Sequence, residues 1–413
     1  MSQFLKVKTA EDVLLMVDQL NPLPAEVIVL EKACGRFVAL DILAPEPVPH
    51  FARATMDGFA VRAGDTFGAS ESLPALLEKA GEVLMGRSAD TPVARGRAVG
   101  VPTGGMLPCG ADAVVMVEYT QPLDASTIEV TRPVAPGENV LQVGEDIRDG
   151  ARMFARGWRL RAQDIGVLAA VGITEISVFR RPRVALISTG DEIVPVNTHP
   201  LPAGRVRDIN SFALAAEIEN SGAEIGMRKT IQDRLEDLVS ACQEALTDHD
   251  MIVLSGGSSV GARDYTIRTL ERLPDSRLLV HGVAIRPGKP VILGFSGEKI
   301  FWGLPGQPVS ALITFRVFVA PSLAKLQGGN PSGATGQRSF RAVLTRRLPS
   351  VHGRTDFFPV IVSREADGTY RADPVFGKSG AISILARADG YVIVPTHVEG
   401  YDRGTEVSVY SFS

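Results

Sequence analysis

The chain has 413 residues, 45% of them hydrophobic and 22% charged, which is typical of a globular protein of roughly two to four domains. A net charge of −4 and the lack of a basic tract argue against a general nucleic-acid-binding protein. The three cysteines are far apart and form no CxxC pair, so they predict neither a zinc site nor a disulfide framework.

The N-terminus shows no signal-peptide pattern, and no apolar run approaches the roughly 18 residues that a membrane-spanning helix needs. The first residues instead predict an amphipathic helix over 5–21, with Thr9 and Asp12 as a capping pair. We therefore expect a cytoplasmic protein without a membrane segment.

A second helix is predicted over 159–172, where apolar residues recur at helical spacing and Gly172 ends the pattern. Between the two helices, the chain is rich in glycine and valine and forms short segments, which is typical of a small β domain with turns. We expect the two helices to pack together into one discontinuous helical domain that this β-rich insert interrupts. The predicted bounds are 1–46 and 147–177 for the helical domain and 47–146 for the insert.

Residues 178–327 alternate strand and helix. VALIS (184–188) and MIVLSG (251–256) are continuous apolar strands, and a helix over 210–222 is expected to start with Asn210 as its cap. Buried parallel strands joined by crossover helices predict a three-layer α/β domain. Ligands of such domains lie beyond the carboxyl ends of the strands.

The loop SGGSSVGARD follows the second of these strands and carries almost no bulky side chains. Glycines let successive backbone N–H groups converge on an anion, and serine hydroxyls add donors. On its own the loop could equally be a plain strand-to-helix turn, and it lacks the GK[ST] and GxGxxG signatures of nucleotide-binding loops. The candidate anion-binding residues are Ser255, Gly256, Gly257, Ser258 and Ser259.

Two further turns of this domain favour an anionic ligand. IRPGKPV places Arg286 and Lys289 on a proline-glycine turn, where a guanidinium fork and an ammonium group suit an oxyanion. GLPGQPVSAL sets Pro305, Gln307 and Pro308 ahead of a helix whose N-terminal donors would face a ligand. Each turn alone could be only a solvated basic turn or an unusual helix start.

Carboxylates accompany these loops. Asp57 lies in ATMDGFAV, Asp146 in GEDI and Glu192 in TGDE, and two more, Asp233 and Asp264, are expected at strand ends of the α/β domain. Any one of them is more often a turn former or a helix cap than a ligand. Acids interleaved with anion-binding loops fit together if a hard divalent cation bridges carboxylate and phosphate oxygens. We therefore expect Mg²⁺, with Asp264 and Glu192 as candidate ligands.

The last region, 338–413, follows a linker rich in glycine, serine and glutamine and consists of short alternating segments. This pattern predicts an all-β C-terminal domain. The six histidines have no HxxH or HExxH spacing, which argues against a catalytic zinc ion.

Seven motifs occur in one order along nearly the whole chain: ATMDGFAV, PTGGMLPCGADAVVMVE, GEDI, STGDE, SGGSSVGARDY, RPGKPV and GLPGQPVSAL. Together they resemble the molybdopterin molybdenumtransferase family, which includes MoeA and the E domain of gephyrin. The resemblance implies a multidomain fold of the α/β plus β class. Its parts would be a molybdopterin-binding three-layer α/β domain, a β-rich insert, a discontinuous helical domain and a small C-terminal β-barrel.

The resemblance also implies a reaction, the insertion of molybdate into adenylylated molybdopterin with release of AMP, in molybdenum cofactor biosynthesis. The serine-glycine loop would hold the pyrophosphate, and Asp264 would reach it through Mg²⁺ or touch the pterin. Family members are homodimers with sites shared between two chains, so we expect a homodimer with composite active sites. Contacts with other cofactor-biosynthesis proteins and with apo-molybdoenzymes are expected as well.

By motif position, the resemblance assigns catalytic roles to Asp57, Thr103, Asp146, Glu192, Asp233, Asp264 and Lys289. It makes Pro305 and Pro308 residues that shape the site. In the C-terminal domain, it points to Arg354 in HGRTDF and Ser379 in GKSGA for contacts with molybdate or substrate.

The chain departs from the family pattern at two positions. Arg286 stands where members commonly have lysine, and Gln307 where they have asparagine; both changes bear on which oxyanion is held. The alternatives to the leading prediction are a tungsten-preferring insertase, a molybdopterin adenylyltransferase and a non-catalytic, gephyrin-like scaffold. Retention of Asp57, Asp264 and Lys289 argues against the scaffold.

Overall fold

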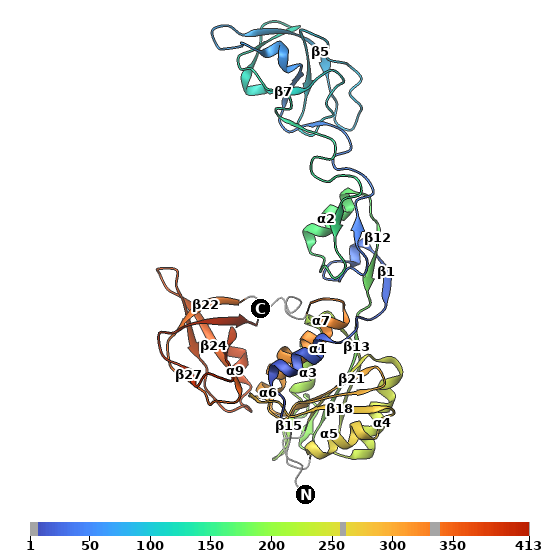
Figure 1. Ribbon diagram of the computed structural model, residues 1–413, viewed down its shortest axis with the longest axis vertical. Helices are drawn as coiled ribbons and strands as arrows, with labels where there is room; N and C mark the ends of the chain where they lie inside the picture. Colours follow the sequence, from blue (N-terminus) through green and yellow to red (C-terminus); the bar gives the residue numbers. More distant parts are fainter. Residues whose placement is uncertain (1–6, 257–261, 331–338, 413) are drawn as a thin grey trace. The chain divides into compact units, whose positions relative to one another are not determined.

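The computed structural model of the chain describes residues 7–256, 262–330 and 339–412 (Figure 1). The chain divides into two compact units. The first comprises Met1–Leu40, Arg156–Arg161 and Ile176–Ser413, and the second comprises Asp41–Ala155 and Ala162–Glu175.

A six-stranded sheet forms the centre of the α/β domain in the first unit. Its strands are β13 (Arg183–Thr189), β16 (Glu224–Ile231), β17 (Met251–Gly256), β18 (Ser276–His281), β20 (Ile292–Ser296) and β21 (Lys299–Pro305). Their order is β16-β13-β17-β21-β20-β18. The first four are parallel, and β20 and β18 are each antiparallel to the preceding strand. The predicted strands VALIS and MIVLSG are thus confirmed at the centre of the sheet.

Helices cover both faces of this sheet, which confirms the three-layer prediction. They are α3 (Asn210–Asn220), α6 (Pro308–Thr314) and α7 (Ala320–Leu326) on one face, and α4 (Leu235–Asp248) and α5 (Ala262–Glu271) on the other (Figure 1). Side chains of one strand alternate between two cores, because successive residues point to opposite faces of a sheet. Val184 and Leu186 lie in the first core, and Ala185 and Ile187 lie in the second.

The N-terminal helix α1 (Ala10–Asp18) is shorter than the predicted 5–21, but the predicted capping pair of Thr9 and Asp12 is confirmed. The Thr9 hydroxyl accepts a hydrogen bond from the Asp12 N–H, and the Asp12 carboxylate accepts one from the Thr9 N–H, both at 3.1 Å. The buried Val13 and Val17 join the core that also contains residues of α7. The expected packing of the N-terminal helix with the helix predicted over 159–172 stays a prediction. That second helix, α2 (Ala162–Ala170), belongs to the second unit.

Helices α6 and α7 are joined by the π-helical segment η4 (Phe315–Val319) into one continuous helix, Pro308–Leu326. By length (19 residues) and mean hydropathy (1.5) this helix could cross a membrane, which the sequence analysis did not anticipate. Within the protein, however, 78% of the apolar window is buried, as expected for the central helix of a folded core.

The C-terminal domain is a closed β-barrel, as the family resemblance implied. Its strands are β22 (Ser339–Leu344), β24 (Thr355–Arg364), β25 (Tyr370–Pro374), β26 (Gly390–Val394) and β28 (Glu406–Ser411). They pair in the order β24-β25-β22-β28-β26, and β26 pairs with β24 to close the ring. The short strand β19 (Ile285–Arg286) of the α/β domain adds to β24 in parallel.

The second unit is built around another six-stranded sheet, in the order β7-β4-β6-β5-β9-β8. The bounds are β4 (Gly58–Val61), β5 (Ala75–Glu82), β6 (Arg97–Val101), β7 (Ala113–Met116), β8 (Thr120–Pro122) and β9 (Thr127–Val130). Two clusters of buried valine, alanine, leucine and isoleucine side chains stabilise it. The β-rich insert expected from the sequence is therefore present.

Candidate functional site

The carboxyl ends of three neighbouring strands bring three of the sequence motifs together. Across the sheet, Ser188 pairs with Ser255, which in turn pairs with Leu304, so β13, β17 and β21 end at the same level. Their following loops border a cavity of about 190 Å³, called here the strand-end cavity. Its lining includes Thr189, Glu192, Asp208, Asn210, Ser255, Gly256, Gly306, Gln307 and Pro308.

Gly256 has a packing reason to be glycine. A Cβ at this position would lie 2.0 Å from the Thr189 Cγ2 and 2.6 Å from the Thr189 carbonyl oxygen, so any larger residue would push β13 away from β17. Ser255 is fully buried, and its hydroxyl accepts a hydrogen bond from Asn210. Gly257, Ser258 and Ser259 lie outside the described residues.

Asn210 has a different role from the predicted helix cap. Ile209 is the residue that precedes α3, and Asn210 is the first residue within the helix. Its buried side-chain amide donates one hydrogen bond to the Ser255 hydroxyl (2.9 Å) and another to the Gly306 carbonyl oxygen (2.8 Å). The amide therefore joins the end of β17 to the loop after β21.

The sequence analysis missed Asp208, two residues earlier. This carboxylate is buried and accepts hydrogen bonds from the Ser188 hydroxyl (3.2 Å), the Thr230 hydroxyl (2.6 Å) and the Ser211 N–H (3.0 Å). It anchors the long loop between β13 and α3 to the ends of β13 and β16. The only local signal was an acid two residues before Asn210, which is indistinguishable from an ordinary turn residue.

The predicted carboxylates of this domain have three different surroundings. Glu192 is exposed and lines the strand-end cavity. Asp233 follows β16, as predicted, and accepts a hydrogen bond from the Thr189 hydroxyl at 2.6 Å. Asp264 was expected at a strand end, but its backbone lies within the first turn of α5, and its side chain is outside the described part of the chain.

A second and larger cavity, of about 980 Å³, lies between the α/β domain and the barrel. Arg286 and Lys289 line it from one side, and Arg354 and Lys378 line it from the barrel. We call it the cationic cleft. It shares Gly306 and Gln307 with the strand-end cavity, so the two cavities adjoin. Pro305 and Ser379 line the cleft too, while Pro308 lines only the strand-end cavity.

The turn that carries the two cations depends on Gly288. Its φ of +107° favours glycine, and a Cβ there would lie 2.2 Å from the Thr314 Cγ2 of α6. The close approach holds the turn against the helix. Arg286 and Lys289 remain exposed at its surface, where they can meet an anion.

Across the cleft, Arg354 is held by a partner that the sequence analysis missed. Its Nε and Nη2 atoms donate to the two carboxylate oxygens of Asp356 at 2.8 and 3.2 Å. Asp356 is 1% exposed and also accepts a hydrogen bond from the Ser350 hydroxyl. The carboxylate thus fixes the Arg354 guanidinium at the wall of the cleft.

The predicted role of the α6 N-terminus needs a correction. Its Val309 N–H group donates to the Ser379 carbonyl oxygen at 3.2 Å, so the barrel occupies a donor that was expected to face a ligand. The Ser379 hydroxyl, in turn, donates to the Gln307 side-chain oxygen. These contacts form the boundary between the two cavities.

In the second unit, the structure brings together two of the three predicted residues. The Asp57 carboxylate accepts hydrogen bonds from the Thr103 N–H (2.6 Å) and the Thr103 hydroxyl (2.8 Å). These bonds, the backbone one first, lower the pKa of Asp57 below its ordinary value, which keeps the exposed carboxylate ionised. Asp146 lies in a separate turn, where its N–H group donates to the Val48 carbonyl oxygen.

Among the described residues, no group of three or more carboxylate, histidine or cysteine side chains could hold a metal ion. Mg²⁺ commonly takes only one or two protein carboxylates and completes its shell with water and substrate phosphates. The exposed Glu192 carboxylate at the strand-end cavity fits that kind of site, in which the substrate supplies the remaining oxygens.

Comparison with known proteins covers the chain from end to end. Residues 5–172 match the MoeA N-terminal region (domain I and II), residues 185–325 match a probable molybdopterin binding domain, and residues 341–412 match the MoeA C-terminal region (domain IV). The matched segments contain the strand-end cavity, the cationic cleft and the Asp57–Thr103 pair.

Individual relatives agree over nearly the full length. A putative molybdopterin biosynthesis protein of Methanocaldococcus jannaschii is 34% identical over 393 residues, 93% of this chain and 91% of that protein. A molybdopterin molybdenumtransferase of Bacillus subtilis is 33% identical over 389 residues, 93% of this chain and 89% of that protein. The crystal structure of a molybdopterin biosynthesis MoeA protein from Pyrococcus horikoshii matches 98% of this chain and all of its own, with a TM-score of 0.85 and 31% identity.

Proposed function

Because the chain belongs to the MoeA family of molybdopterin molybdenumtransferases, we propose that it inserts molybdate into adenylylated molybdopterin and releases AMP. The protein is a transferase of molybdenum cofactor biosynthesis. One observation about its own residues supports the specific reaction: a cleft lined by four cationic side chains adjoins a cavity at the carboxyl ends of three strands.

The two cavities suit the two substrates. Molybdate is a small dianion, and Arg286, Lys289 and Arg354 supply a guanidinium fork, an ammonium point charge and a second guanidinium at the cationic cleft. The pyrophosphate of adenylylated molybdopterin is expected near the strand-end cavity, where ligands of parallel sheets bind. The shared boundary at Gly306 and Gln307 would let the oxyanion meet the dithiolene of the pterin.

The direct test is AMP release from adenylylated molybdopterin, measured with and without molybdate. We expect release to depend on molybdate, and tungstate in competition would show which oxyanion is preferred. Release at the same rate without molybdate would contradict insertion. Formation of adenylylated molybdopterin from ATP and molybdopterin would identify an adenylyltransferase instead.

We further propose that the reaction requires Mg²⁺, held by Glu192 and Asp264 together with the substrate pyrophosphate. The support is one exposed carboxylate at a cavity suited to an anion. AMP release should stop on treatment with a chelator and return when Mg²⁺ is added. Full activity of the metal-free protein would refute this requirement.

We also propose a homodimer in which each active site combines Asp57 and Thr103 of one chain with the α/β domain of the other. Mixing inactive Asp57→Ala with inactive Asp264→Ala protein, after dissociation and reassociation, tests this arrangement. Random pairing makes half the dimers mixed and leaves one intact site in each, so about a quarter of wild-type activity should return. No recovery in confirmed mixed dimers would contradict it. A cytoplasmic location and contacts with other cofactor-biosynthesis proteins and apo-molybdoenzymes remain predictions.

A further inference from the structure

The cationic cleft has walls from two domains, so its width depends on how the barrel is attached to the α/β domain. One attachment lies at the cleft itself. There β19 pairs in parallel with β24, with Arg286 opposite Asp356, and the Thr355 N–H group donates to the Ala284 carbonyl oxygen at 2.9 Å. The Val309–Ser379 and Gln307–Ser379 contacts also join the two domains at the cleft, so the tilt of the barrel depends on contacts outside the cleft.

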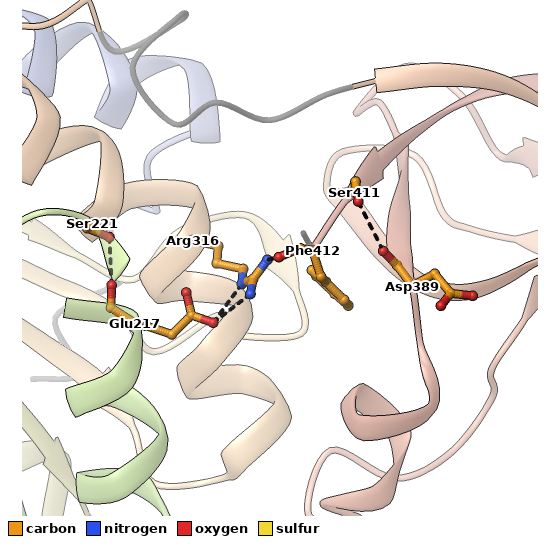
Figure 2. A network of polar contacts seen from close by, with 6 residues as sticks. All are labelled: Glu217, Ser221, Arg316, Asp389, Ser411 and Phe412. Carbon is orange, nitrogen blue, oxygen red and sulfur yellow. Dashed lines mark hydrogen bonds and ion pairs between the residues drawn. The ribbon is translucent and has the colours of Figure 1, made fainter. Parts of the chain in front are cut away.

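An attachment outside the cleft is made by Arg316 in the π-helical segment η4 (Figure 2). Its Nε and Nη2 atoms donate to the Glu217 carboxylate of α3 at 3.0 and 2.6 Å. Its Nη1 atom donates to the Phe412 carbonyl oxygen at 3.0 Å, and the guanidinium carbon lies 4.4 Å from the centre of the Phe412 ring. One side chain thus joins α3, the central helix and the end of the last barrel strand.

The contacts continue into the barrel beside Phe412, where the Ser411 hydroxyl lies 3.5 Å from the Asp389 carbonyl oxygen (Figure 2). The Phe412 N–H group donates to the Asp389 carbonyl oxygen at 2.9 Å, and the Asp389 carboxylate accepts a hydrogen bond from the Val362 N–H at 2.7 Å. Val362 belongs to β24, the strand whose other end carries Asp356 and pairs with β19. The two attachments therefore hold opposite parts of the same strand.

We propose that Arg316 is a positioning residue, which holds the barrel wall of the cationic cleft at the distance from Arg286 and Lys289 that binds the oxyanion. The inference rests on the proposed function, since it takes the cleft to be the oxyanion site. Arg316 does not line the cleft and acts through the placement of β24 and Arg354.

The burial of the Arg316–Glu217 pair explains why it holds the barrel in a defined orientation to the α/β domain. The side chains of Arg316 and Glu217 are 19% and 17% exposed, so neither charge can exchange its partner for water at low cost. The rigid guanidinium fork also demands a defined angle between α3 and the C-terminal segment. Loss of Arg316 would leave a largely buried carboxylate unpaired and release Phe412 from the helix.

An ordinary stabilising ion pair would have the same contacts, so a matched control is needed. Arg180 and Asp250 form a bidentate pair at 2.9 and 2.7 Å, with side chains 35% and 10% exposed. Neither residue lines the cationic cleft, and neither belongs to the barrel. Arg180→Met should destabilise the protein as Arg316→Met does, without moving the barrel.

The experiment compares Arg316→Met, Arg316→Lys and Arg180→Met with the wild type. Molybdate binding to the protein alone is measured by calorimetry, and hydrogen exchange is measured at the Thr355 and Phe412 amides. We expect Arg316→Met to weaken molybdate binding about tenfold, because misplacement of binding groups by about 1 Å has effects of this order or larger. Exchange at both amides should rise. Arg316→Lys should restore part of the binding, and Arg180→Met should change neither quantity.

Unchanged exchange in Arg316→Met would overturn the proposal, as would equal losses of molybdate binding in Arg316→Met and Arg180→Met. If the wild type binds no molybdate while exchange rises only in Arg316→Met, the assignment of the cleft to the oxyanion fails and the attachment role stands. The two failures are therefore distinguishable.

Discussion

Replacement of Asn210 by alanine should destabilise the α/β domain, because its amide makes two buried hydrogen bonds at the candidate site. The bonds to Ser255 and Gly306 are 2.9 and 2.8 Å long, and each such bond contributes about 1 kcal/mol. Their loss also leaves the Gly306 carbonyl oxygen without this donor. Alanine is the better helix former by several tenths of a kcal/mol, which offsets a part of the loss. We expect a net decrease of about 2 kcal/mol in the free energy of unfolding.

The assay is urea denaturation followed by tryptophan fluorescence. Trp302 is fully buried in the α/β core and reports on this domain, whereas Trp158 is 42% exposed and can be removed by Trp158→Phe in all variants. Asn220→Ala, at the exposed end of the same helix, is the matched control and should change the free energy of unfolding by less than about 0.5 kcal/mol.

Asn210→Asp separates the hydrogen bonds from the shape of the side chain. A carboxylate of the same size has no donor for the Gly306 carbonyl oxygen and places a buried charge beside it, so this variant should be less stable than Asn210→Ala. Wild-type stability of Asn210→Asp, or equal effects of Asn210→Ala and Asn220→Ala, would refute the assignment. The KM for adenylylated molybdopterin should rise in Asn210→Ala, since the end of β17 and the loop after β21 lose their connection.

Three other changes have defined outcomes. Lys289→Met should lower kcat/KM for molybdate by the equivalent of about 2 kcal/mol and leave the melting temperature unchanged. A kcat/KM equal to that of the surface control Lys229→Met would show that the Lys289 ammonium group binds no oxyanion. Asp356→Asn should release Arg354 and lower the free energy of unfolding by about 2 kcal/mol, less than for a fully buried pair because the arginine is one-third exposed. Both the urea midpoint and the affinity for molybdate should fall, and no change in either would contradict the role of Asp356 in holding Arg354. Burial raises the pKa of the Cys242 thiol to about 12, so only the two exposed cysteines should react with a thiol reagent at pH 8, and three reactive thiols in the native protein would be inconsistent with this burial. Because the thiol ionises near 9.0 in the unfolded chain, the free energy of unfolding should fall as the pH rises above about 9.

The sequence by itself determined the features that depend on neighbouring residues. Continuous apolar runs predicted the central strands β13 and β17, because strands covered on both faces need no polar side. The capping pair of Thr9 and Asp12 and the helix start at Pro308 followed from backbone donors within one turn. Motif order also identified the loops at the carboxyl ends of the strands and the cations of the cleft.

The tertiary structure decided which of these residues meet, and it corrected individual roles. Asn210 has the sequence pattern of a helix cap, yet its partners lie 45 and 96 residues away and are brought to it by the register of β17 and β21. Arg316 carried no local signal, because its importance comes from contacts between the α/β domain and the barrel. Asp356 lies only two residues from Arg354, but its burial depends on the packing of the barrel. Local patterns reflect interactions over a few residues, whereas a buried hydrogen bond between distant segments depends on the packing of the whole core.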